Sequence, residues 1–145
     1  MLTKRESKTT VELGAREGES TIPLLFAAKE TGGQVFSFDL DDCQDAKRVV
    51  SEFGLSSHWQ FTRADDLAVD RDEPIDHLFV DTNHTYEQTI AELKKFEPFV
   101  REGGIITMHD NVTYPDVGRA ASDYLRGRHD LARYDYLNNN GLTAI

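Results

Sequence analysis

The 145-residue chain carries a formal net charge of −10, from 16 basic and 26 acidic residues, and 39% of its residues are hydrophobic. This length supports one core and leaves little room for a second, so a single domain over residues 1–145 is predicted. The acidic balance argues against a broad nucleic-acid-binding face, which needs clustered basic residues, and favours a small-molecule substrate.

No apolar run reaches the length of a membrane span or of a signal-peptide core, so no membrane partner is predicted. Cys43 is the only cysteine and cannot form an internal disulfide. Both observations predict a cytoplasmic protein.

Strand and helix patterns alternate along the first half of the chain. A β-branched run at 9–13 predicts a strand, and the helix that follows its glycine-containing turn is predicted to end near residues 32–33. A second strand is predicted over 34–38. The apolar spacing over 46–54 predicts an amphipathic helix, and 59–62 a third strand.

The second half continues this alternation. The polar segment 63–74 predicts a loop with a short helix, and 77–80 a buried fourth strand. Apolar residues over 90–100 predict a helix ended by glycines 103–104, before a fifth strand at 105–108. The remaining predicted elements are a helix and the two strands of a terminal hairpin, at 117–125, 132–137 and 141–145.

This order predicts an α/β fold with a Rossmann-like, doubly wound, mostly parallel seven-stranded sheet, an antiparallel C-terminal hairpin and helices on both faces. Ligands bind at the carboxyl ends of strands in such sheets. An acidic residue stands at that end of several predicted strands: Glu12, Asp39, Asp81 and Asp110. Isolated Asp residues are common in turns and helix caps, but their repetition at strand ends predicts a shared site.

The turn after the first strand is the most informative segment. Gly14 and Gly18 allow a sharp turn and a close approach of ligand to backbone, although they could also simply make a tight connection. The helix that starts after Ser20 would present free N–H groups to a carboxylate or phosphate. Arg16 occupies the middle glycine position of the dinucleotide motif G-x-G-x-x-G, which disfavours NAD.

The pattern E-x-G-x-x-x-G-x-S from Glu12 to Ser20 resembles the first motif of class I S-adenosylmethionine-dependent methyltransferases. Residues 79–86 and 103–111 are similar to two motifs of small-molecule O-methyltransferases of the catechol and antibiotic-sugar types. The resemblance implies methyl transfer from S-adenosylmethionine to a hydroxyl of a small molecule, assisted by a divalent cation, with magnesium expected.

The same resemblance implies a set of cofactor contacts. It assigns Asp39 to the two ribose hydroxyls, which a carboxylate can bind together. Ala64 and Asp65 would border the adenine, although Arg63 stands where relatives often have glycine. The implied cofactor residues are Glu12, Gly14, Gly18, Ser20, Asp39, Ala64, Asp65 and Asp81.

Asp81, Asp110 and Asn111 match the three cation ligands of the resembled enzymes. Oxygen donors with open positions suit magnesium. If the fourth and fifth strands are neighbours, the two carboxylates would also repel one another unless a cation or a proton lies between them. Alternatively, basic side chains neutralise the pair, the candidates being Lys94, Lys95 and Arg101.

His84 stands where the catechol-type enzymes have a lysine base, so Asp81 and His84 are the implied catalytic residues. An imidazole is a suitable proton acceptor near neutral pH. Two alternatives stay open: His84 caps the helix that starts near Tyr86, or His109 is the base.

Relatives usually have N-terminal helices that close over the substrate, but only Met1 to Lys8 precede the first predicted strand. The predicted domain therefore lacks most of this lid. It is a minimal enzyme with an open site, a truncated relative, or a chain completed by a partner subunit or a second copy. Two other functions remain open from the residues alone, a non-catalytic S-adenosylmethionine- or nucleoside-binding module and an NAD-dependent Rossmann enzyme.

Overall fold

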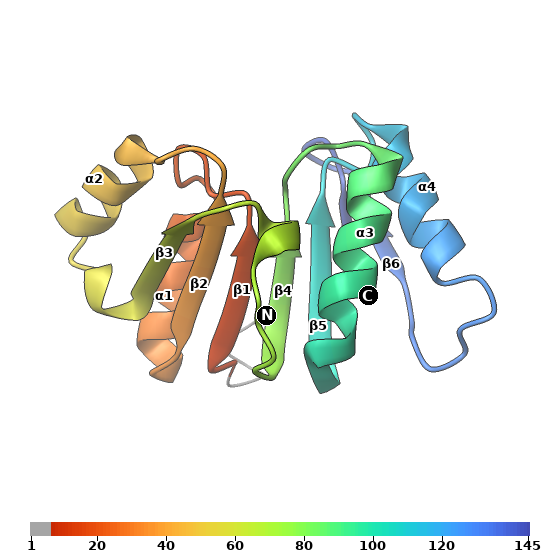
Figure 1. Cartoon of the computed structure of the whole chain (residues 1–145), viewed down its shortest axis with the longest axis horizontal. Helices are drawn as coiled ribbons and strands as arrows, with labels where there is room; N and C mark the ends of the chain where they lie inside the picture. Colours follow the sequence, from red (N-terminus) through yellow and green to blue (C-terminus); the bar gives the residue numbers. More distant parts are fainter. Residues whose placement is uncertain (1–6) are drawn as a thin grey trace.

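The computed structural model describes residues 7–145 and contains one seven-stranded sheet with the order β3-β2-β1-β4-β5-β7-β6 (Figure 1). Its strands are β1 (Thr9–Leu13), β2 (Gln34–Asp39), β3 (Trp59–Arg63), β4 (Ile75–Val80), β5 (Val100–His109), β6 (Tyr134–Tyr136) and β7 (Leu142–Ala144). Its α-helices are α1 (Thr21–Thr31), α2 (Gln44–Glu52), α3 (Tyr86–Phe96) and α4 (Pro115–Tyr124).

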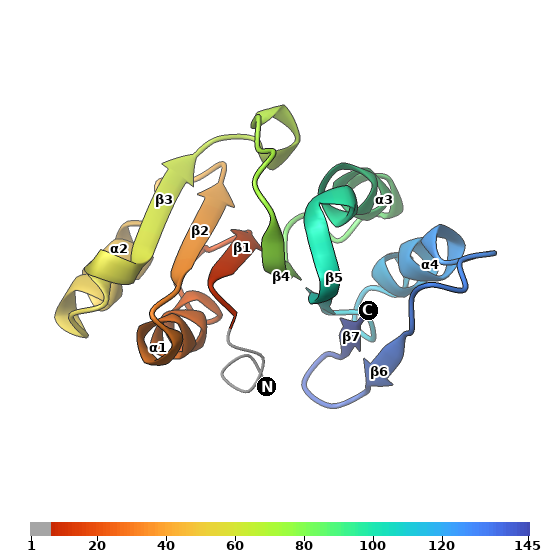
Figure 2. The same ribbon diagram turned by 90° about the horizontal axis from the view of Figure 1, so that it is seen from below.

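Strands β1 to β5 pair in parallel, and β7 pairs antiparallel with both β5 and β6. Figure 2 shows α1 and α2 on one face of the sheet and α3 and α4 on the other. The strand order reverses between β1 and β4, because the chain leaves β3 at the sheet edge and returns to the far side of β1. The predicted fold class and the adjacency of the fourth and fifth strands are confirmed.

Two apolar layers hold the helices to the sheet. Val11 and Leu13 of β1 belong to the larger one, which buries Leu93 and Phe96 of α3. The alternate β1 residues, Thr10 and Glu12, are also buried, on the α1 side of the sheet. Because successive strand residues point to opposite faces, β1 is covered on both faces, as expected for a central parallel strand.

One predicted boundary is wrong. The helix expected to continue to Val100 ends at Phe96 and is followed by a 3-10 turn over Glu97–Phe99, after which β5 begins. Pro98 explains the difference, since it cannot donate the backbone hydrogen bond that a continuing helix requires. Gly103 and Gly104 therefore lie inside β5, where the register with β4 shifts, and do not end a helix.

The C-terminal hairpin is present but shorter than predicted, with three residues in each strand. The short helix expected in segment 63–74 is a 3-10 turn over Asp66–Ala68. Within residues 7–145, no helix has both the length and the apolar character needed to cross a bilayer. The predicted lack of a lid concerns mostly residues 1–6, which lie outside the described residues.

His77 is a titratable group in the core of β4. Its Nε2 lies 2.7 Å from Thr107 Oγ1 of β5, and burial lowers its pKa to about 4. The unfolded chain binds this proton near pH 6.5. The group therefore contributes stability above about pH 6.5 that is lost as the pH falls towards 4.

His77→Gln keeps a polar group for Thr107 and removes the titration. Between about pH 7 and pH 5, we expect the wild-type free energy of unfolding to fall by about 2 kcal/mol more than that of the variant. Urea unfolding of both proteins at the two pH values measures the difference. Parallel losses in the two proteins would show that His77 does not set this pH dependence.

Candidate active site

A cavity of about 300 Å³ opens at the carboxyl ends of the central strands. Its wall includes Gly14 after β1, Asp39 of β2, Ala64 and Asp65 after β3, and Asp81 after β4. All of these residues are predicted cofactor contacts. They converge because parallel strands present their carboxyl ends at one edge of the sheet, beside the point where the strand order reverses.

Gly14 makes the turn at the base of this cavity possible. Its φ is +87°, and a Cβ at this position would lie 2.1 Å from the carbonyl oxygen of Asp81. The Gly14 N–H donates to Phe38 O at 2.9 Å, and the Asp81 N–H donates to Leu13 O at 2.9 Å. The turn is thus fixed against both neighbouring strands, and no side chain fits between them.

The structure gives Gly18 a packing role. It does not line the cavity, and a Cβ there would lie 3.1 Å from the Cβ of Ala46 in α2. Gly18 therefore lets α2 approach the turn. This role corresponds to the alternative that the glycines simply make a tight connection.

Glu12 also lies beneath the cavity and not in its wall. Its carboxylate is completely buried and accepts hydrogen bonds from Ser20 Oγ at 2.7 Å, Thr21 Oγ1 at 2.9 Å and Ser37 Oγ at 2.5 Å. Burial raises the pKa of Glu12 against the effect of these hydroxyls. Ser20 thus binds Glu12, and it also lines a smaller cavity together with Gly14 and Asp81.

Asp39 organises the same turn from the side. Its Oδ2 accepts the N–H groups of Ala15 at 2.9 Å and Arg16 at 3.0 Å, and its Oδ1 accepts the N–H of Asp41 at 2.9 Å. Burial alone would raise the pKa of Asp39, but these backbone hydrogen bonds hold it below its usual range. A carboxylate oxygen has two lone pairs, so Oδ2 is fully used by the two N–H groups and Oδ1 retains capacity for a ligand in the cavity.

The far wall contains two residues that the sequence analysis missed. Asp66 and Gln88 line the cavity beside Asp65, and Gln88 Nε2 donates to Glu92 Oε1 at 2.8 Å and to Asp66 Oδ1 at 3.3 Å. Burial, together with the nearby Asp66, raises the pKa of Glu92. The spacing of Gln88 and Glu92 by four residues puts them on one face of α3 and was the available signal.

Asp81, His84 and Asp110 form a cluster at the ends of β4 and β5. His84 Nε2 lies 3.1 Å from Asp81 Oδ1 and 3.0 Å from Asp110 Oδ2. One candidate ligand atom from each of the three residues lies within 4.8 Å of the others. The structure thus brings together two predicted cation ligands and the predicted base, with the imidazole between the carboxylates.

Tyr114 supports this imidazole. Its ring stacks on His84 with centroids 4.3 Å apart and an interplanar angle of 9°. The predicted alternative for His84, a helix cap, is filled by another residue, because the Thr85 side chain accepts the N–H of Gln88 at the start of α3. His109 is also adjacent, with Nδ1 3.0 Å from Asp110 Oδ1.

Two of the basic side chains considered as neutralising groups are engaged elsewhere. Arg101 forms an ion pair with Asp76, and Lys95 Nζ donates to the carbonyl of Asp66 at 2.8 Å. Nitrogen atoms of the His84 and His109 imidazoles lie 3.0 to 3.8 Å from the carboxylate oxygens of Asp81 and Asp110.

Asn111, the third predicted cation ligand, directs its amide nitrogen towards the C-terminal hairpin. Nδ2 donates to Thr143 Oγ1 at 2.8 Å and to Asp135 Oδ1 at 3.2 Å. Its Oδ1 is buried and has no hydrogen-bond partner among the described residues. A buried acceptor without a donor is unusual and fits a position that a cation or a bound hydroxyl would satisfy.

The sequence profile of the methyltransferase domain family matches residues 11–111. No curated protein matches the sequence. Residues 11–111 include most of β1, all of β2 to β5 and every predicted site residue.

Solved structures share the fold at low sequence identity. A methyltransferase from Podospora anserina, bound to S-adenosylhomocysteine, superposes with a TM-score of 0.74 at 14% identity, over 98% of this chain and 72% of its own. The cofactor-bound protein Rv0187 from MTB superposes with a TM-score of 0.78 at 18% sequence identity, over 99% of this chain and 74% of its own. A third structure is that of the O-methyltransferase TomG from Streptomyces achromogenes, which is involved in tomaymycin synthesis and is bound to S-adenosylmethionine. It superposes with a TM-score of 0.72 at 21% sequence identity, over 98% of this chain and 74% of its own.

Gly14→Ala tests whether the site depends on the close contact between the first turn and β4. Gly54→Ala is the matched control, because Gly54 has a φ of +64° but no atom within 4 Å of an added Cβ. We expect the control to lose about 1 kcal/mol of unfolding free energy from backbone strain. Gly14→Ala should lose about 2–4 kcal/mol, since overlap with Asp81 adds to that strain. Equal losses in urea unfolding would contradict this account.

Proposed function

This chain belongs to the methyltransferase domain family, and we propose that it transfers the methyl group of S-adenosylmethionine to a hydroxyl of a small molecule, assisted by a divalent cation. The observation that carries the proposal is that Asp81 belongs both to the cavity and to the acidic cluster. It lines the cavity beside the glycine turn and also contacts His84 of the acidic cluster. A donor in the cavity would thus have its reactive end beside the cluster.

We assign the nucleoside to the part of the cavity between Asp39 and Asp65. The Asp39 carboxylate stands at the end of β2, where Oδ1 can accept a further hydrogen bond from a ribose hydroxyl, and Asp65 and Gln88 offer polar atoms to a base. Arg16 also lines this cavity at the position where a dinucleotide motif has its middle glycine. This crowding supports S-adenosylmethionine over NAD.

We assign His84 the role of proton acceptor. When bound, S-adenosylmethionine supplies a sulfonium methyl group, and its displacement leaves S-adenosylhomocysteine. His84 Nε2 faces two carboxylates and therefore carries the ring proton, so the other ring nitrogen would take the proton of the acceptor hydroxyl as its oxygen replaces sulfur on the methyl carbon. Asp81 and Asp110, 3.1 and 3.0 Å from Nε2, stabilise the resulting imidazolium.

The cation ligands in this proposal are Asp81, Asp110 and Asn111. Two carboxylates and a buried amide oxygen without a donor are a chemically suitable set for magnesium, which prefers oxygen and retains several waters. Such a cation would supply positive charge that favours ionisation of the acceptor hydroxyl.

The net charge of −10 supports a small neutral acceptor over a polyanion and agrees with a cytoplasmic enzyme. We propose that a second copy of the chain or a partner subunit supplies the additional substrate contacts.

Asp39→Ala tests the cofactor assignment. Loss of the ribose hydrogen bond to this charged group should weaken S-adenosylhomocysteine binding by about 1.5–3 kcal/mol in calorimetry. Asp39→Asn is the control, because it retains an acceptor for the N–H groups of Ala15 and Arg16. Tight NAD binding without response to S-adenosylmethionine would instead indicate a Rossmann enzyme of another class.

Removal of divalent cations tests the assisted reaction. A chelator should abolish methyl transfer to small hydroxyl acceptors and leave S-adenosylmethionine binding unchanged, and Asp110→Asn should reproduce this pattern. Product detection by mass spectrometry and calorimetry of the same samples provide the two readouts. Full turnover in chelator would exclude cation assistance, and binding without product from any acceptor would favour a non-catalytic module.

A further inference from the structure

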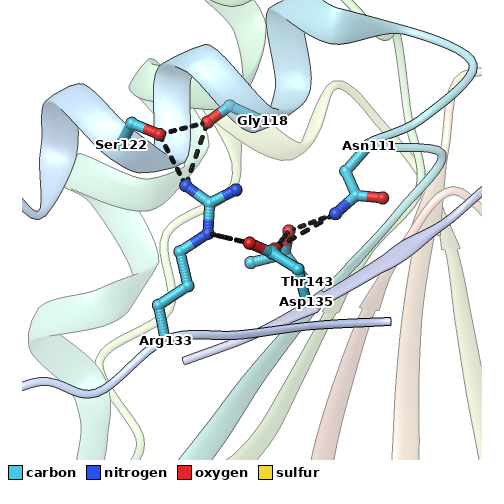
Figure 3. Close-up of polar contacts among 6 residues, drawn as sticks. All are labelled: Asn111, Gly118, Ser122, Arg133, Asp135 and Thr143. Carbon is cyan, nitrogen blue, oxygen red and sulfur yellow. Dashed lines mark hydrogen bonds and ion pairs between the residues drawn. The ribbon is translucent and has the colours of Figure 1, made fainter. Parts of the chain in front are cut away.

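A polar network connects Asn111 to the C-terminal hairpin and to α4 (Figure 3). It contains Asp135 of β6, Thr143 of β7 and Arg133, which precedes β6. These residues lie outside the cavity and the acidic cluster described above. They contact the site through Asn111, which directly follows Asp110.

Arg133 holds the Asp135 carboxylate in place. Its Nε donates to Asp135 Oδ1 at 3.0 Å, and its Nη1 donates to Gly118 O at 3.1 Å and to Ser122 Oγ at 2.6 Å. The planar guanidinium therefore joins β6 to α4 with directed hydrogen bonds at both ends, as Figure 3 shows. Burial alone would raise the pKa of Asp135, but hydrogen bonds from Thr143 and Arg133 hold it below its usual range.

This arrangement allows one orientation of the Asn111 amide. An ionised carboxylate only accepts hydrogen bonds, so Asp135 requires the NH₂ group. Thr143 gives its hydroxyl proton to Asp135 Oδ1 at 2.6 Å and can then only accept from Asn111. A flipped amide would set its oxygen against two acceptors, and the two hairpin strands thus direct Oδ1 away from Asp135 and Thr143.

On that side, Oδ1 lies against the backbone of Gly141, where a Cβ would be 1.7 Å away. Gly141 has a φ of +92°, and its carbonyl accepts the N–H of Asp110 at 2.9 Å. A side chain at residue 141 would displace the amide oxygen. The buried Oδ1 thus has a fixed position and no donor among the described residues.

We propose that Asp135, fixed by Arg133, is a positioning residue that presents the carbonyl oxygen of Asn111, and not its amide nitrogen, as a cation ligand. The inference rests on the proposed function for the presence of a cation beside Asp110. Its content concerns the orientation of a single amide. Partners that orient metal ligands commonly change metal affinity about 10- to 100-fold when they are removed.

Asp135→Asn tests the proposal, because it keeps the size of the side chain but can present either an oxygen or an NH₂ to Asn111. We expect Mn²⁺ binding, measured from the loss of the aqueous Mn²⁺ paramagnetic resonance signal, to weaken about 10- to 100-fold. S-adenosylhomocysteine affinity should be unchanged. Asp130→Asn is the matched control, since Asp130 pairs with Arg128 away from Asn111 and should leave Mn²⁺ binding unaltered.

A second pair of variants keeps the test decisive if Asp135→Asn fails to fold. Thr143→Ser retains the hydroxyl that accepts from Asn111 and should retain Mn²⁺ binding, whereas Thr143→Val removes it and should weaken binding. Equal Mn²⁺ affinity in folded Asp135→Asn and wild-type protein, or in the Ser and Val variants, would overturn the proposal.

The outcomes also separate this inference from the proposed function. Wild-type protein that binds S-adenosylhomocysteine but no Mn²⁺ would overturn the positioning role and leave methyl transfer standing. Mn²⁺ binding that depends on Asp135 in a protein that binds no S-adenosylhomocysteine would uphold the positioning role and remove the proposed function.

Discussion

The close contact between the turn after β1 and the end of β4 is the constraint on which the site depends. Gly14 can approach the Asp81 carbonyl only because it has no Cβ, and backbone hydrogen bonds from Gly14 to Phe38 and from Asp81 to Leu13 fix the turn between β2 and β4. Since β1 is the strand at which the order reverses, this contact sets the distance between the two halves of the site. The cavity wall at Asp39 and the acidic cluster at Asp81 are consequently parts of one rigid unit.

Several carboxylates lie at this same edge of the sheet, and each has a different kind of hydrogen-bonding partner. Glu12 is buried among hydroxyls, and burial raises its pKa. Asp39 receives backbone N–H groups, which lower its pKa. Asp81 and Asp110 share the imidazole of His84. Burial, donor number and neighbouring charge thus give chemically distinct carboxylates from one repeated residue type at strand ends.

Local pattern predicted the strands, the adjacency of β4 and β5 and a shared acidic site at the strand ends, because strand ends in a parallel sheet meet at one edge. It could not predict the direction of a side chain within that edge. Glu12 points into the α1 layer because the alternation along β1 turns it away from Val11 and Leu13, which face α3. The spacing of Gln88 and Glu92 could predict that they share a face of α3, but not that this face packs against Asp66 in the segment after β3.

The antiparallel hairpin shows why a distant segment matters to the site. Asp110 has a φ of +65°, an uncommon conformation for a residue with a side chain, and the loop it begins needs external support. The hairpin turn supplies it, since Gly141 O accepts from Asp110 N–H and Asn140 O accepts from Val112 N–H, each at 2.9 Å. These bonds satisfy backbone donors that the end of β5 leaves unpaired. The closing strands therefore complete the loop that begins at Asp110 as well as the sheet.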